Sequence, residues 1–201
     1  MSNDLENLKG HILAALDSSL NGAHITNGEL VLEARREDIA GTIAFLRDDP
    51  VCKFTTLIDI CGVDYPGRER RFDVVYHLLS MQLNHRIRVK ITTDADTPVR
   101  TMTGVYPAAN WFEREAFDMY GIAFDEHPDL RRLLTDYGFE GHPLRKDFPL
   151  SGFVEVRYDE ERKSVIYEAV NLPQEFRDFD FMSPWEGAKY VMDEEEKGEG
   201  V

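Results

Sequence analysis

The first 50 residues carry two helical patterns with a strand pattern between them. Leucine and isoleucine recur every three or four positions at the start of the chain, which predicts an amphipathic helix: Leu5, Leu8, Ile12 and Leu16. Residues 29–33, ELVLE, predict a short strand. Residues 37–46 predict a second helix, which ends before Pro50 because proline cannot continue a helix.

Three strand candidates follow in the middle of the chain. Residues 54–63 are rich in β-branched side chains, residues 72–81 are almost continuously apolar, and residues 86–93 alternate apolar and polar positions. The sequence QLNH joins the last two candidates and suits a hairpin. Thr97 and Pro98 are typical of a helix start, so a short helix is expected through Met102.

The stretch NWFEREAFDMYGIAF predicts another helix. Asn110 is expected to cap it, Glu113 to complete a capping box, and Gly121 to end it in a left-handed conformation. Helices, then adjacent strands, then helices indicate an α+β fold with a small mixed or antiparallel sheet and packed helices. We expect this core over residues 1–150, with a docking loop at residues 132–150, followed by a long extended C-terminal arm over residues 151–201.

Composition excludes several classes of protein. The 201 residues carry a formal net charge of -15, which would repel a phosphate backbone, so no nucleic-acid partner is expected. Cys52 and Cys61 form no CxxC motif, and two thiols cannot ligate a conventional iron–sulfur cluster alone. They are expected to be reduced. No stretch reaches the roughly 20 apolar residues that span a bilayer, so membrane association is expected only through another protein.

Few residues are candidates for chemistry. Glu115 and Asp118 could face one another as an acid/base pair or half of a dimetal site. We favour a charged surface in which Arg114 pairs with Asp118. His127 and His142 are too far apart in sequence for a compact zinc site and have no thiol between them. No GxSxG, GxGxxG or GxxxxGK[ST] motif occurs, and neither cysteine has an evident histidine partner in sequence. No catalytic, cofactor-binding or metal-binding residue is therefore expected.

The chain changes character after residue 150. Residues 151–201 hold 14 acidic and 6 basic side chains, yet the segment is rich in aromatic residues. These are Phe153, Tyr158, Tyr167, Phe176, Phe179, Phe181, Trp185 and Tyr190. A solvated acidic tail normally lacks aromatic residues, and here they keep no regular period for long. We interpret the segment as an arm that buries its aromatic side chains against another protein, the alternative being that it folds back on its own domain.

A long motif runs through residues 113–158. It reads ERE at 113–115, DMYGI at 118–122, Phe124, HP at 127–128, RRLLTDYGF at 131–139, GHPLRKDFPL at 141–150 and EVRY at 155–158. This motif closely resembles the signature of the 30-kDa subunit family, also called the C subunit family, of proton-translocating NADH-quinone oxidoreductase, respiratory complex I. The resemblance covers most of the chain and is weakest before Phe54 and in the last ten residues.

The resemblance implies a non-catalytic structural and assembly subunit of the peripheral arm, docked chiefly on the quinone-pocket subunit of the 49-kDa type. FMN, iron–sulfur clusters and quinone would then belong to partner subunits that carry electrons from NADH. The implied location is the cytoplasmic side of the bacterial inner membrane, or the mitochondrial matrix side. Two alternatives stay open: the equivalent docking subunit of a related membrane-bound hydrogenase complex, and an independent metal-dependent enzyme using Glu115, Asp118 and His127.

The same resemblance implies a partner interface on the motif. Its expected residues are Glu113, Arg114, Glu115, Asp118, Tyr120, Gly121, His127, Arg131, Arg132, Tyr137, Gly138, Arg145, Lys146, Asp147 and Pro149. Aromatic and arginine side chains carry much of the energy of protein interfaces, so the expected anchors are Tyr120, Arg131, Tyr137, Arg145 and the aromatic residues of the arm. Asp118 and Asp147 are expected as buried charge partners.

Overall fold

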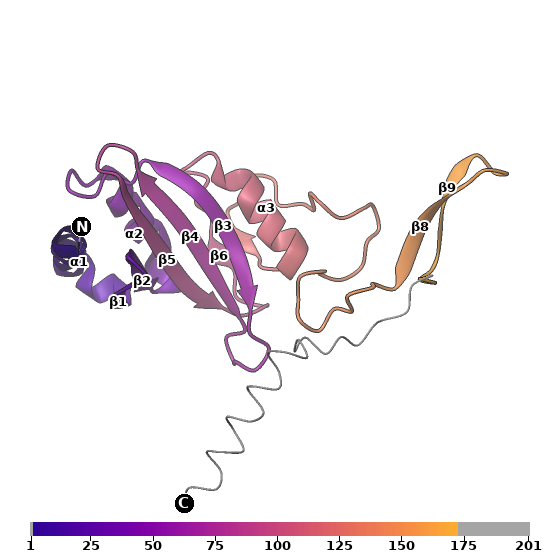
Figure 1. The fold of residues 1–201 in the computed structure, drawn as a ribbon, viewed down its shortest axis with the longest axis horizontal. Helices are drawn as coiled ribbons and strands as arrows, with labels where there is room; N and C mark the ends of the chain where they lie inside the picture. The colour runs from indigo at the N-terminus through magenta and orange to yellow at the C-terminus, as the bar shows by residue number, and fades with distance from the viewer. Residues whose placement is uncertain (1, 173–201) are drawn as a thin grey trace, which may run out of the picture. The chain divides into compact units, whose positions relative to one another are not determined.

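The computed structural model of the chain describes residues 2–172 (Figure 1). The chain falls into two units, Met1–Gly152 and Phe153–Val201. The contacts expected of five aromatic residues of the arm lie outside the described residues: Phe176, Phe179, Phe181, Trp185 and Tyr190.

A five-stranded mixed sheet forms the centre of the first unit. Its strands are β1 (Leu20–Thr26), β2 (Glu29–Ala34), β3 (Thr56–Asp64), β4 (Phe72–Ser80) and β5 (His85–Thr93). They lie in the order β1-β2-β5-β4-β3, in which β2 and β5 are parallel and all other neighbours are antiparallel. The expected α+β class, the four predicted strands and the β4–β5 hairpin are thereby confirmed.

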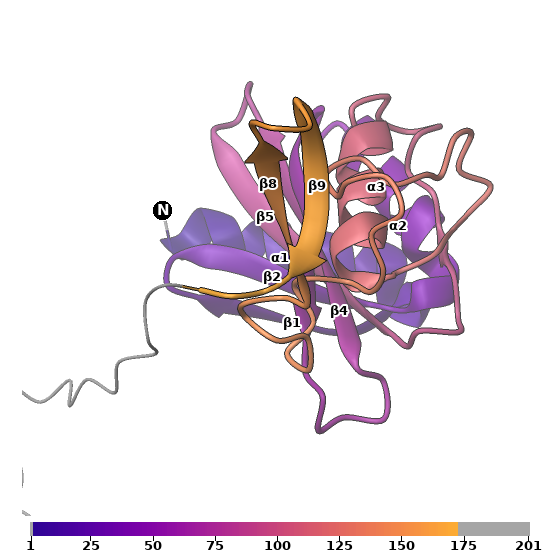
Figure 2. The same ribbon diagram turned by 90° about the vertical axis from the view of Figure 1, so that its right-hand side faces the viewer.

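The helices share a core with one face of this sheet. They are α1 (Ser2–Leu16), α2 (Ile39–Asp48) and α3 (Ala109–Tyr120), with short 3₁₀ turns at Asp17–Ser19 and Arg36–Asp38. Leu32, Val89 and Tyr76 lie side by side on β2, β5 and β4 and are fully buried. Ile12 of α1 and Ala116 of α3 belong to the same core. Figure 2 shows α2 and α3 on one side of β4 and β5.

The prediction of a short helix after Thr97 is wrong. Val99–Arg100 instead form β6, which pairs in parallel with β7 (Phe124–Asp125). The Thr97 N–H donates to Asp94 Oδ1 at 2.7 Å, and the Thr97 carbonyl accepts a hydrogen bond from Thr93 Oγ1 at 2.6 Å. These side-chain bonds compete with a helix start and hold this connection in a turn.

The two ends of α3 differ in how well the sequence predicted them. The helix begins at Ala109, with Ala108 at the cap position and no side-chain cap, so the expected Asn110 cap is wrong. Its end is confirmed, because Gly121 has a φ of 75° in the left-handed region and its N–H donates to the Phe117 carbonyl at 2.8 Å. No helix among residues 2–172 is long and apolar enough to cross a membrane.

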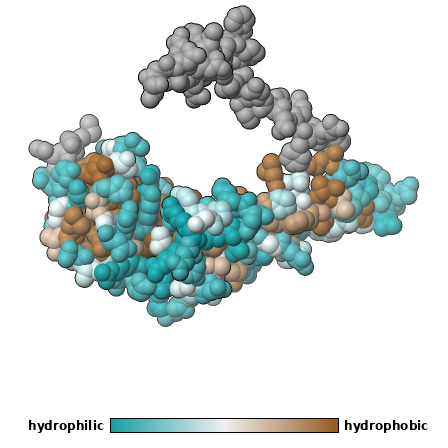
Figure 3. Space-filling model, turned by 90° about the horizontal axis from the view of Figure 1, so that it is seen from below, coloured by the Kyte–Doolittle hydropathy of each residue, from teal (hydrophilic) through white to brown (hydrophobic). Residues whose placement is uncertain are grey.

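The described part of the second unit is a β-hairpin that the sequence analysis did not predict. Its strands are β8 (Val154–Asp159) and β9 (Ser164–Ala169), paired antiparallel. Apolar side chains alternate along both strands, and directly paired residues share a face. That face consists of Val154, Val156, Tyr158, Val165, Tyr167 and Ala169. All six are exposed, and Figure 3 shows apolar residues at the surface of this hairpin.

Candidate functional site

Asp118 on α3 binds the start of the loop that the sequence analysis predicted for docking. Its carboxylate, which is buried, accepts hydrogen bonds from the N–H groups of Leu133, Leu134 and Thr135 at 2.9, 2.7 and 2.9 Å. It also accepts bonds from Thr135 Oγ1 at 2.6 Å and from Arg132 Nη1 at 2.9 Å. Burial alone would raise the pKa of Asp118, but the hydrogen bonds from Thr135, Leu134 and Leu133 outweigh it and lower that pKa.

Arg114 does not form the expected ion pair with Asp118 among the described residues. Its guanidinium donates instead to the carbonyls of Arg131 at 3.1 Å and Arg132 at 3.3 Å. Glu115 is exposed and borders a cavity of about 100 Å³ between β3 and α3. The carboxylates of Glu115 and Asp118 therefore have separate surroundings, and Asp118 is occupied by the loop.

The end of α3 is bound by residues further along the same loop. The ring Nδ1 of His142 lies 2.9 Å from the Asp118 carbonyl, and Arg145 Nε donates to the Tyr120 carbonyl at 2.6 Å. The guanidinium of Arg145 also lies over the ring of Phe72, 5.1 Å from its centroid. The last carbonyls of a helix have no partner within the helix, and here the loop supplies partners for them.

A third contact joins the loop to the turn between β3 and β4. The buried carboxylate of Asp64 accepts two hydrogen bonds from Arg71, at 2.6 and 2.8 Å, and one from the Lys146 N–H at 2.7 Å. The hydrogen bonds from Arg71 lower the pKa of Asp64. Arg71 also pairs with Asp147 at 2.8 Å, although the Asp147 side chain is 60% exposed. Asp118 and Asp64 thus hold the loop at both of its ends.

Glu113 is buried and does not act in a capping box. It accepts hydrogen bonds from Thr101 Oγ1 and from the Met102 N–H, both at 2.5 Å. Burial raises the pKa of Glu113 to about 7, although these two hydrogen bonds oppose the shift. His127 Nε2 lies 3.8 Å from the Glu113 carboxylate and 3.1 Å from the Asn110 carbonyl. The side chains of Glu113 and His127 therefore join three separate segments of the chain.

The fifteen residues expected at the partner interface differ in exposure. Six are exposed: Glu115, Arg131, Tyr137, Gly138, Lys146 and Asp147. Nine are buried or half-buried: Glu113, Arg114, Asp118, Tyr120, Gly121, His127, Arg132, Arg145 and Pro149. As partner contacts, all fifteen stay predictions. Among them, Tyr137 is 99% exposed. Trp111 is not among the expected contacts, yet it is 67% exposed, and tryptophan is enriched among the strongest interface contacts.

The hairpin of the second unit presents one apolar and one more polar face. Val156 and Tyr167 form a directly opposed pair at the centre of the apolar face, and both are more than half exposed. On the other face Arg157 pairs with Glu168 at 2.8 Å. An exposed apolar face on a two-stranded hairpin is a candidate binding surface, because such hairpins gain little stability alone in water.

One group of residues 2–172 could hold a metal ion: His11, Asp49 and Cys52. Neither cysteine has an evident histidine partner in sequence, but the fold brings His11, which is distant in sequence, close to Cys52. Glu115, Asp118 and His127 form no such group among the described residues.

Comparisons with known proteins agree on one family. The family described as "Respiratory-chain NADH dehydrogenase, 30 Kd subunit" matches residues 32–154. The C subunit of NADH-quinone oxidoreductase from Maricaulis maris is 66% identical over 200 residues, covering 100% of both chains. Its counterpart in Xanthobacter autotrophicus is 60% identical, covering 100% of this chain and 96% of the relative.

The fold is also similar to that of a chain in a solved complex. This is the membrane-bound sulfane sulfur reductase, an archaeal respiratory membrane complex, with a TM-score of 0.62 and 24% identity. The similarity covers 72% of this chain and 85% of that chain. Because the family match spans more than half of the sequence and the identities to both relatives extend over its whole length, the chain belongs to the family of the 30 Kd subunit of respiratory-chain NADH dehydrogenase.

Proposed function

We propose that the chain is a non-catalytic structural and assembly subunit of the peripheral arm of proton-translocating NADH-quinone oxidoreductase. Partner subunits hold FMN, the iron–sulfur clusters and quinone, and they transfer electrons from NADH. This chain stabilises that route by docking chiefly on the quinone-pocket subunit of the 49-kDa type, on the cytoplasmic side of the bacterial inner membrane. The family and the names of its relatives support the proposal.

The exposed apolar face of the β8–β9 hairpin is the observation that carries the docking role. Val156 and Tyr167 lie at its centre and contact water over more than half of their surface. Fully burying one valine side chain is worth about 1.5–3 kcal/mol. A partner that covers this face would therefore gain affinity and stabilise the hairpin at the same time.

A docking subunit of a related membrane-bound hydrogenase complex is the second candidate. The same fold occurs in a chain of another membrane complex, the archaeal sulfane sulfur reductase. The full-length similarity to relatives named as part of NADH-quinone oxidoreductase favours that enzyme instead. The third idea, a metal-dependent enzyme that uses Glu115, Asp118 and His127, has less support. The Asp118 carboxylate already accepts hydrogen bonds from the loop, and His127 contacts the Asn110 carbonyl.

Adjacent residues of β9 offer a matched test of the docking role. Val165→Glu places a charge on the apolar face, and Ile166→Glu places the same charge on the opposite face, beside Arg157. We expect Val165→Glu to reduce co-purification with the quinone-pocket subunit and NADH-quinone reductase activity, and Ile166→Glu to leave both near wild type. Equal assembly of both variants would contradict docking through the apolar face. Co-purification of the wild-type chain with hydrogenase subunits in place of NADH-oxidising ones would overturn the assignment to complex I.

A further inference from the structure

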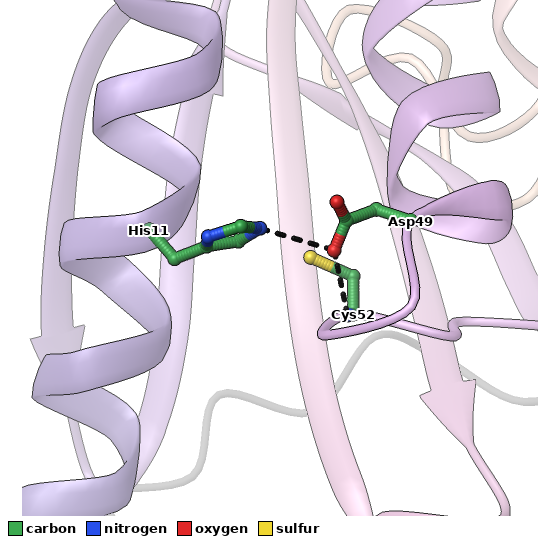
Figure 4. A group of neighbouring side chains, drawn as sticks. All are labelled: His11, Asp49 and Cys52. Carbon is green, nitrogen blue, oxygen red and sulfur yellow. Dashed lines mark hydrogen bonds and ion pairs between the residues drawn. The ribbon is translucent and has the colours of Figure 1, made fainter.

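Three side chains of different chemistry converge where α1 meets the turn after α2 (Figure 4). His11 projects from α1, whereas Asp49 and Cys52 belong to the turn that follows α2. His11 Nε2 lies 3.0 Å from Asp49 Oδ1. An imidazole nitrogen, a carboxylate oxygen and the thiol sulfur all lie within 4.8 Å of one another. Two segments that are distant in sequence thus bring three kinds of metal ligand to one place.

Local contacts hold these groups in position. Asp49 Oδ1 accepts hydrogen bonds from the N–H groups of Val51 at 2.8 Å and Cys52 at 3.1 Å, which fix the turn. The ring of His11 stacks on Phe45 of α2, with 6.2 Å between the ring centroids. Ligands whose orientation is fixed before binding lose less entropy when a metal binds.

We propose that His11, Asp49 and Cys52 bind a divalent cation of the zinc type. Nitrogen and sulfur ligands favour zinc and its relatives, whereas calcium and magnesium prefer oxygen ligands alone. Metal–ligand bonds of about 2.0–2.3 Å place tetrahedral ligands about 3.3–3.8 Å apart, so a shift of about 1 Å is enough to close the present spacing. The His11 side chain is 36% exposed, so a water molecule can reach the fourth position.

The charges and protons of this site balance. A carboxylate, a thiolate and a neutral imidazole together carry two negative charges, which match a dication. A cysteine thiol is ordinarily protonated at neutral pH, so the metal displaces about one proton from Cys52. The bond that breaks is S–H, the bond that forms is metal–sulfur, and the proton goes to solvent. Such a site would join α1 to the turn after α2 and stabilise the folded chain, because the unfolded chain does not hold the three ligands together.

Cobalt(II) is a suitable probe because a thiolate ligand gives it a charge-transfer absorption in the near ultraviolet. The full-length chain, without an affinity tag and freed of metal by a chelator, is titrated with Co²⁺ and, separately, with Zn²⁺. We expect one ion per chain, release of about one proton, and a rise in melting temperature. Cys52→Ser should abolish the absorption band. Cys61→Ser is the matched control and should retain it, because Cys61 lies on β3 outside the group.

His11→Ala gives an independent test at a less buried position. Loss of a group that merely orients a ligand costs about 10- to 100-fold in affinity, so loss of the ligand itself should weaken Co²⁺ binding at least about 100-fold. Circular dichroism checks that each variant is folded. The proposal is overturned if folded wild type shows no thiolate band and no stabilisation at a large excess of either metal. It is equally overturned if His11→Ala binds Co²⁺ with unchanged affinity and an unchanged band.

Discussion

Arg132 Nη1 lies 2.9 Å from Oδ1 of Asp118, a carboxylate whose side chain has no exposed surface. The pair closes the start of the loop onto α3, and the loop returns to the end of α3 through His142 and Arg145. Charged residues that resemble interface anchors in the sequence thus stabilise the shape of the loop itself. Any surface that the loop offers a partner depends on these internal contacts.

Replacing Asp118 by asparagine should destabilise the chain. The neutral amide weakens the pairing with Arg132, and its NH₂ group cannot accept the hydrogen bonds that the lost oxygen accepted from the loop. We expect a loss of about 2–4 kcal/mol in the free energy of unfolding, measured by urea denaturation. Asp129→Asn is the control, because its pair with Arg131 is on the surface, and its stability should stay close to wild type.

The Asp118→Asn variant also tests how the free energy of unfolding depends on pH. Burial would raise the pKa of Asp118, but the hydrogen bonds from the loop outweigh it, so this pKa is lower in the folded chain than its ordinary value of 3.8. A carboxylate of this kind stabilises the fold above its unfolded pKa and loses that contribution as the pH falls. The difference between wild type and Asp118→Asn should therefore be constant between pH 7 and about pH 5 and shrink below about pH 4. A constant difference down to pH 2 would contradict this origin.

Glu113 should give the opposite pH dependence of stability. Its pKa is raised from 4.5 to about 7 by burial, so the fold favours the protonated acid. The stability that this acid contributes is complete below pH 4.5 and is lost as the pH rises through about 7. Wild type should therefore lose stability between pH 5 and about pH 8, by on the order of 3 kcal/mol, whereas Glu113→Gln should have a flatter profile. Urea denaturation across this range measures both profiles.

His127 is the control for that profile, because its Nε2 lies 3.8 Å from Oε2 of Glu113. His127→Gln should retain the downward slope between pH 5 and pH 8 if Glu113 causes it. If His127→Gln is flat and Glu113→Gln keeps the wild-type slope, the assignment to Glu113 is wrong.

Alanine substitution at two glycines with the same backbone conformation distinguishes the cost of backbone strain from the cost of side-chain crowding. Gly121 and Gly138 both have a φ of 75°. A Cβ added at Gly121 would lie 2.5 Å from Arg145 Nη2 and 2.6 Å from His142 Nε2, whereas one at Gly138 would meet no atom within 4 Å. Both alanine variants should lose about 1 kcal/mol from the left-handed backbone. Gly121→Ala should lose at least about 1 kcal/mol more, because Arg145 and His142 are bound to α3 and must move.

Thermal or urea unfolding of the two variants gives that difference directly. Hydrogen exchange adds a local readout, since the N–H of Leu144, which donates to the Met119 carbonyl, should exchange faster only in Gly121→Ala. Equal losses of unfolding free energy in both variants would show that Arg145 and His142 move aside at little cost, which would contradict the close packing described.

The parts of the fold that the sequence predicted are those set by local periodicity. The stripe at Leu8 and Ile12 and the alternation around Val89 each place apolar side chains on one face, and burial of that face decides the element. The helix expected after Thr97 failed because side chains of neighbouring residues, among them Asp94, bind its backbone. Propensity at a cap does not reveal such competing hydrogen bonds.

The candidate site was predicted less completely for a related reason. The motif contained Asp118, Arg132 and Arg145, but their partners are backbone groups in a segment without periodicity, so sequence pattern gave no sign that they bind within the chain. Cys52 and His11 come together only because α1 and α2 pack on the same sheet. Contacts between distant segments depend on tertiary packing, which single-sequence patterns do not encode.

The exposure of side chains in the loop and of the adjacent Arg131 predicts which interface variants affect assembly and which affect folding. Tyr137 and Arg131 are exposed, so Tyr137→Ala and Arg131→Glu should leave the unfolding of the isolated chain within about 0.5 kcal/mol of wild type. If the loop docks on a partner, both should reduce co-purification and quinone reductase activity. Arg145→Glu should lower the stability of the isolated chain, because Arg145 donates to the Tyr120 carbonyl and packs over Phe72.

Measuring urea unfolding and co-purification on the same preparations separates the two effects. Arg145→Lys is the matched control, since it keeps the charge but loses the guanidinium geometry. It should resemble Arg145→Glu in stability if the internal contact matters most, and wild type if only charge matters. Normal assembly of both Tyr137→Ala and Arg131→Glu would show that the loop and Arg131 do not contribute to the interface, and docking would then rest on the hairpin. A stable Arg145→Glu chain that fails to assemble would instead show that this arginine binds the partner.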